Sequence, residues 1–127
     1  MSRVWSRARS DRGQAAVELA LVLPVVLVVL LLVVQVGLVV RDQVLVVHAA
    51  REAARAASVG DPQDRITWAA QRSGPLDASR LQVDVHGDGA GQDVEVDLRY
   101  RSVTDLPLVG PLVPDVVLHA RAVMRRE

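Results

Sequence analysis

The chain has 127 residues, half of them hydrophobic, yet only 2% are aromatic and Phe is absent. Its 15 basic residues balance its 15 acidic residues, and this zero formal net charge argues against a protein whose overall basic surface binds nucleic acid. Cysteine is also absent, which excludes disulfides, thiolate metal sites, cysteine nucleophiles and lipid attachment through a thioether.

The first 13 residues form a basic arm. They carry four Arg and one Asp, a net charge of +3, so the remainder of the chain has a net charge of −3. Positively charged segments beside a membrane span tend to stay in the cytoplasm. We therefore expect residues 1–13 to be a cytoplasmic leader and the C-terminal part to be extracytoplasmic.

An uncharged segment of 22 residues, Leu19 to Val40, follows this arm. As a helix it would be about 33 Å long, enough to cross a hydrocarbon core of about 30 Å. It is longer than the apolar core of a cleaved secretory signal. The rest of the chain is too short to bury a helix that is apolar on every side, as a soluble protein would have to. We expect residues 14–40 to form a single span of the cytoplasmic membrane.

Residues 41–127 are predicted to form one extracytoplasmic domain. The helix should continue to Ala57, because the segment 49–57 is rich in alanine, and should end before Gly60 and Pro62. A short second helix is expected to begin there, with Asp61 as its N-cap, and to stop at residues 73–75.

The remaining pattern predicts three strands. Apolar and polar residues alternate over residues 81–86, 94–101 and 116–124, which indicates strands with one covered face. Glycines at 87–91 suggest a hairpin loop, and the prolines within 105–115 exclude a central strand there. The predicted fold class is α+β: a long N-terminal helix, its first half in the membrane, packed on a small antiparallel sheet, with one short extra helix.

Glu18 is the first candidate functional residue. A carboxylate at the edge of an apolar span is costly unless it is paired, protonated or able to reach the interface, so Glu18 either lies among the headgroups or awaits a partner. No serine, histidine and acid stand at the spacing of a known catalytic motif, and the three histidines are not clustered. We expect no cofactor and no metal, and a membrane-bound hydrolase has no catalytic constellation to support it.

The stretch RGQAAVELALVLP, residues 12–24, closely resembles the TadE-like family, small proteins with one membrane span found in Flp (Tad) pilus systems and related to type IV pilins and pseudopilins. The alanine-rich segment 48–57 and the ending at 120–127 also look like parts of that family. The resemblance implies a pilin-like fold and a minor pilin or pseudopilin of pilus biogenesis or a related secretion system.

The resemblance also implies processing by a membrane prepilin peptidase after Gly13, which would make Gln14 the new N-terminus and Glu18 the fifth mature residue. The freed amine of one subunit could then neutralise the Glu18 carboxylate of its neighbour. The implied partners are the membrane, the peptidase, other pilin-like subunits and the assembly machinery, without nucleic acid.

Two positions depart from the family pattern. Leu19 stands where a Phe is common, and Gln35-Val36-Gly37 stands where Glu-Phe-Gly is often found, which puts in doubt a role for an intramembrane acid there. Gln35 could hydrogen-bond between helices or be a single tolerated polar residue. One alternative function stays open: an uncleaved single-pass anchor whose outer domain binds an envelope partner.

Overall fold

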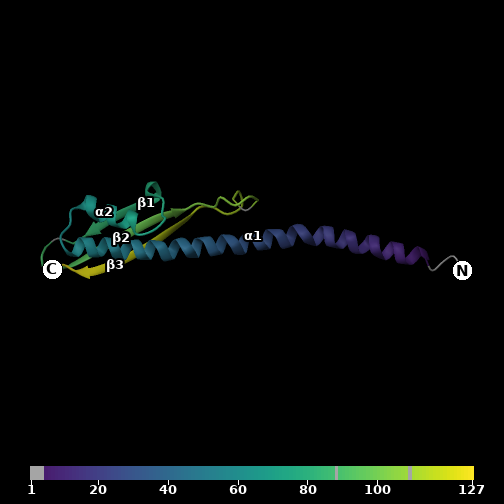
Figure 1. Ribbon diagram of the computed structural model, residues 1–127, viewed down its shortest axis with the longest axis horizontal. Coiled ribbons are helices and arrows are strands. Elements are labelled where there is room, and N and C mark those ends of the chain that lie inside the picture. Colours follow the sequence, from purple (N-terminus) through teal and green to yellow (C-terminus); the bar gives the residue numbers. More distant parts are fainter. Residues whose placement is uncertain (1–4, 88, 109) are drawn as a thin grey trace.

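The computed structural model describes the backbone of residues 5–87, 89–108 and 110–127, and side chains from Gly13 onward. The basic side chains of the predicted leader, at positions 3, 7, 9 and 12, therefore lie outside the described part. A long helix carries a small α+β domain at its C-terminal end, and its N-terminal half projects away from that domain (Figure 1).

Helix α1 runs from Trp5 to Ser58 without interruption, with Pro24 inside it. It ends where predicted: Gly60 has a φ of +81°, which favours glycine, and its N–H donates to the carbonyl of Ala57 at 3.1 Å. The first half of α1 has no packing partner among the described residues, whereas the last turns are covered by the sheet and by the second helix.

The core of the domain is built on the alanine-rich part of α1. Its fully covered side chains are Val46, Ala49, Ala50, Ala53, Ala54 and Ala57. Because alanine has only a methyl group, the backbones of the sheet and of the second helix can approach α1 closely, and the larger core residues come from the strands.

The three strands form one antiparallel sheet in the order β1-β2-β3. Strand β1 spans Leu81–His86, β2 spans Asp93–Ser102 and β3 spans Val116–Arg125. In the central strand β2, alternate residues are buried against the helices: Val94, Val96, Leu98 and Tyr100. This confirms the predicted α+β fold, with a long helix packed on a small antiparallel sheet.

The second helix, α2, spans Gln63–Arg72 and packs against α1. The prediction that Asp61 is its N-cap is wrong. Pro62 occupies the cap position without a side-chain hydrogen bond, and Asp61 instead lies 3.8 Å from the guanidinium of Arg65. A single turn of 3-10 helix, η1 (Ala78–Arg80), was not predicted; Asp77 caps it by accepting the N–H of Ser79 at 3.0 Å.

Three polar contacts fix the sheet to the middle of α1. The Gln35 amide donates to the Thr104 hydroxyl at 2.9 Å, and the Ser102 hydroxyl donates to Asp42 at 2.7 Å. The Gln43 amide donates to the carbonyl of His119 at 3.2 Å. The first of these three contacts along α1 is therefore at Gln35, five residues before Val40, where the uncharged segment ends.

Candidate processing and assembly segment

Gly13 lies within α1 in open space. A methyl group added at its Cα would meet no atom within 4 Å, apart from the helix's own neighbouring backbone, among the described residues. In an exposed helix interior, glycine is about 1 kcal/mol less favourable than alanine. Glycine at this position therefore costs helix stability, and neither a turn nor a close packing contact in the fold requires it.

Gln14 and Glu18 lie one helical turn apart on the exposed surface of α1. The side-chain amide of Gln14 donates to Oε1 of Glu18 at 3.2 Å. The hydrogen bond joins two exposed side chains, and none of the described cations forms an ion pair with Glu18. Among the described side chains, Gln14 is therefore the hydrogen-bond partner of the exposed Glu18 carboxylate.

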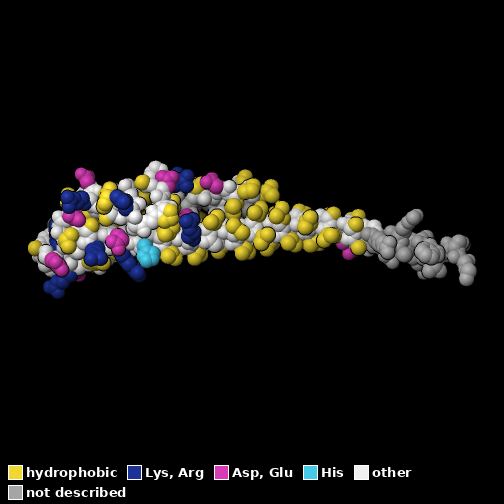
Figure 2. Space-filling view, in the orientation of Figure 1, with side chains coloured by type: hydrophobic (Ala, Val, Ile, Leu, Met, Phe, Trp, Pro, Cys, Tyr) yellow, Lys and Arg dark blue, Asp and Glu magenta, His cyan; other side chains and the backbone are white. Residues whose placement is uncertain are grey.

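The helix surface beyond Glu18 is apolar all round. Between Val17 and Val34 the Val and Leu side chains stay largely exposed, for example Leu19 at 65% and Leu21 at 69%. Figure 2 shows this as a continuous hydrophobic surface along the helix. In the searched part of the chain, α1 is the one helix long and apolar enough to cross a membrane.

This segment of α1 is similar to a known protein family. Residues 13–55 match the family model described as TadE-like protein. The match confirms the predicted resemblance and relates the chain to Tad pilus systems. No curated protein and no solved structure matches the chain significantly.

The TadE-like match begins at Gly13 and ends at Arg55, so it covers the apolar and alanine-rich parts of α1 and about a third of the chain. It does not reach residues 120–127, whose likeness to the family's ending stays a prediction; residues 120–125 form the second half of β3. Gln35, which departs from the family pattern, is buried and bonded to Thr104 of the same chain, so its amide serves the fold of the subunit itself.

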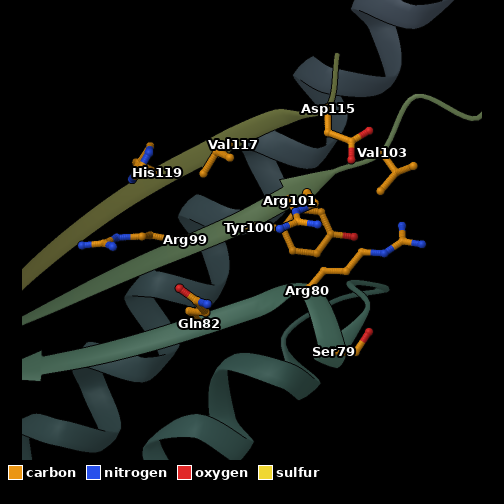
Figure 3. A pocket seen from close by; sticks show the side chains of 10 residues that line it. All are labelled: Ser79, Arg80, Gln82, Arg99, Tyr100, Arg101, Val103, Asp115, Val117 and His119. Atoms are coloured by element: carbon orange, nitrogen blue, oxygen red, sulfur yellow. The ribbon is translucent and has the colours of Figure 1, made fainter. Parts of the chain in front are cut away.

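A hollow of about 620 Å³ lies on the outer domain, and none of the residues that line it belongs to the TadE-like segment (Figure 3). Arg80, Arg99, Arg101 and His119 line it, together with Asp115. In the searched residues, no three His, Asp or Glu side chains are grouped closely enough to hold a metal ion. Its three arginines and one aspartate give the hollow a net positive charge.

Opposite charges pair between the neighbouring strands β2 and β3. The Arg121 guanidinium lies 2.9 Å from Asp97 and 3.1 Å from Glu95. The hydrogen bond to Asp97 raises the pKa of Arg121, with the charges of Asp97 and Glu95 acting in the same direction. Arg121 is exposed and the two acids are half-buried at the surface, so the pairs contribute modest stability and leave a mixed-charge surface.

Proposed function

We propose that this protein is a minor pilin or pseudopilin of a Flp (Tad) pilus biogenesis system or a related secretion system, processed by prepilin peptidase after Gly13. The TadE-like match starting at Gly13, on a helix whose apolar surface is bare, carries the proposal. Such a helix needs lipid or other subunits around it, and a pilin-like subunit meets both in turn.

The glycine supports processing at this point. Because the fold makes no use of Gly13, the residue is better explained by a recognition event outside the folded chain. A peptidase must bring the peptide backbone close to its catalytic groups, and the absence of a side chain before the scissile bond allows that approach.

Glu18 supports assembly. After cleavage, Gln14 carries the new α-amine, and a neighbouring subunit shifted along the helix axis can bring this amine to the exposed Glu18 carboxylate. In an apolar surrounding, such a pair neutralises two charges that would each be costly alone. Removal of the basic arm also releases the cytoplasmic anchor, which permits extraction of the subunit from the bilayer.

The topology follows from charge. The basic leader stays in the cytoplasm, α1 crosses the cytoplasmic membrane once, and the domain formed by residues 41–127 is extracytoplasmic. The subunit is a substrate and building block, not an enzyme, and it needs no cofactor.

The uncleaved anchor stays the second candidate, and one observation favours it. Helix α1 is continuous through the bond between Gly13 and Gln14, whereas a peptidase acts on an extended backbone. Cleavage therefore requires the first turns of α1 to unwind in the peptidase. If they do not, the chain remains a single-pass protein whose outer domain binds an envelope partner.

A matched pair of glycine substitutions separates the two candidates. Gly13→Leu and Gly37→Leu both add the same side chain to open space on α1. When each variant is expressed with its cognate peptidase, we expect Gly13→Leu to remain full-length and Gly37→Leu to be shortened like the unsubstituted chain. Equal shortening of both variants, measured by intact mass, would show that Gly13 is not the recognised residue.

A further inference from the structure

The loop between β2 and β3 is the second apolar surface of the molecule. From residue 106 to residue 114 it contains no charged side chain, and Asp105 and Asp115 bracket this segment. Two of its leucines point away from the domain: Leu108 is 60% exposed and Leu112 is 74% exposed. On a surface that faces water, polar side chains would serve equally well at these two positions. The exposed leucines therefore indicate an apolar surrounding.

A hydrogen bond to α1 fixes the start of this loop at a definite depth relative to the predicted membrane span. Thr104, which starts the loop, accepts a hydrogen bond from Gln35, and Gln35 lies five residues inside the uncharged segment that ends at Val40. Five residues of helix correspond to about 8 Å along the axis. From this root, the loop extends beyond the sheet toward the N-terminal half of α1 (Figure 1).

The polar groups at this level are shielded from the surroundings. Gln35 is only 5% exposed and Thr104 only 8%, and the Gln35 amide N–H donates to the Thr104 hydroxyl, while the Gln35 Oε1 atom is buried without a hydrogen-bond partner among the described residues. The charged residues Arg41 and Arg101, which are exposed, lie near the next contact toward the sheet, between Asp42 and Ser102. Asp105 and Asp115 are also exposed at the two roots of the loop, so charged groups lie at the roots and the bare leucines lie farther along the loop, which is the order of a headgroup region passing into acyl chains.

The backbone of the loop also suits an interface. Pro107, Pro111 and Pro114 carry no N–H, so three donors that would need a partner away from water are absent. The N–H of Gly110 is paired with the carbonyl of Leu106 at 2.8 Å. A side chain at Gly110 would come within 2.9 Å of the Thr104 carbonyl, so glycine is needed for this tight turn.

We propose that the β2–β3 loop inserts into the outer leaflet beside α1 and places Leu108 and Leu112 at the boundary between headgroups and acyl chains. An apolar surface that binds this boundary lies about 5–10 Å deep, which agrees with the depth of the Gln35 tether. The protein thus has two membrane contacts, a spanning helix and a shallow loop, and the loop fixes the height and rotation of the outer domain over the bilayer.

The test uses the natural absence of cysteine. Single substitutions Leu112→Cys, Leu108→Cys and Val117→Cys are made in the full chain, each labelled with a polarity-sensitive fluorophore. Val117 is also apolar and 52% exposed, but it lies on β3, outside the loop. Each protein is placed, one chain per disc, in nanodiscs of phosphatidylethanolamine and phosphatidylglycerol, with and without lipids that carry a quencher in the upper acyl chain.

We expect a blue-shifted emission and strong quenching by the lipid quencher at positions 108 and 112, but neither at position 117. Equal behaviour at positions 112 and 117 would overturn the proposal. A blue shift without lipid quenching, found only when several chains share a disc, would also overturn it and would indicate that another subunit covers the loop.

A label introduced by Val29→Cys, in the middle of α1, distinguishes failure of this inference from failure of the membrane span. Val29 is 53% exposed and lies within the uncharged segment. Lipid quenching at position 29 but not at positions 108 and 112 would refute the loop insertion alone. Absence of quenching at all of these positions would refute the span, on which both this inference and the proposed function rest.

Discussion

The hydroxyl of Ser102, at the end of β2, donates a 2.7 Å hydrogen bond to the carboxylate of Asp42 on α1. Sixty residues of chain separate the two groups. Asp42 lies two residues after Val40, the last residue of the uncharged segment, so this contact joins the sheet to the helix close to the point where the predicted membrane span ends. A hydrogen bond to a charged group is stronger than one between neutral groups.

The Asp42–Ser102 contact should stabilise the outer domain. We expect Asp42→Ala to lower the free energy of local opening of β2 by about 1–3 kcal/mol, because the variant loses the charge-assisted bond and leaves the part-buried Ser102 hydroxyl unpaired. Hydrogen exchange of the β2 amides, measured on the full chain in mild detergent, reports this opening. Glu52→Ala, an exposed acid on the same helix, should change β2 protection by less than about 0.5 kcal/mol. Equal effects of the two substitutions would contradict the assigned role of Asp42.

The alanine face of α1 should not tolerate larger side chains. Ala53 is fully buried between helix and sheet, so Ala53→Leu must displace backbone or neighbouring side chains, at a cost of about 1–3 kcal/mol or more. Ala78→Leu, on the exposed turn η1, adds the same atoms to the surface and serves as the control. Thermal unfolding of both full-length variants in detergent gives the comparison. An unchanged midpoint for Ala53→Leu would mean that the face is loosely packed.

Asp77 should make the domain sensitive to acid. Hydrogen bonds from Ser79, through its side chain and its backbone N–H, lower the pKa of Asp77 below the ordinary value of 3.8, with a smaller contribution from Arg80. A lowered pKa in the folded state means that the stabilisation is complete above about pH 4 and is lost as the pH falls through the folded-state value. The exposed position of the group makes the effect small.

We therefore expect Asp77→Asn to lose less stability than the unsubstituted chain when the pH is lowered from 5 to 2.5. The measurement is the unfolding midpoint at each pH. If Asp77→Asn and the unsubstituted chain show the same decrease, the capping contact has no ionic component.

Glu18 provides the test of the assembly step. We expect Glu18→Ala to be shortened by the peptidase like the unsubstituted chain, because the scissile bond lies four residues away, but to assemble poorly because the amine of a neighbour has no carboxylate to pair with. Glu18→Gln keeps the shape and the Gln14 contact without the charge, and it should assemble as poorly. Normal assembly of either variant, measured as the fraction of subunit in sheared pili or in isolated assemblies, would refute the charge pairing.

Local sequence patterns predicted the elements of this fold well. Two features follow from rules that act within a few residues: α1 ends just before Gly60, and buried residues alternate along β2 at Val94, Val96, Leu98 and Tyr100. The predicted N-cap of α2 was wrong by one residue: Pro62 occupies the cap position, and the Asp61 carboxylate lies 3.8 Å from the Arg65 guanidinium. The segment around Gly13 was visible in sequence because it is a short contiguous motif.

Long-range contacts could not be predicted in the same way. The partner of Gln35 is Thr104, 69 residues later, and this pairing depends on the register of β2 and on the height at which the sheet meets α1. For the same reason, the sequence indicated a loop at residues 105–115 but gave no sign that this loop extends beyond the sheet toward the N-terminal half of α1 (Figure 1).

Cleavage of the bond after Gly13 is tested by determining the N-terminus of the mature protein. The full chain is expressed with and without its cognate prepilin peptidase, and the membrane-bound form is analysed by intact mass and N-terminal sequencing. We expect a product that begins at Gln14 and contains 114 of the 127 residues, and that forms only when the peptidase is present. A full-length product in both cases, with the peptidase active on another substrate, would contradict processing after Gly13 and establish an uncleaved single-pass anchor.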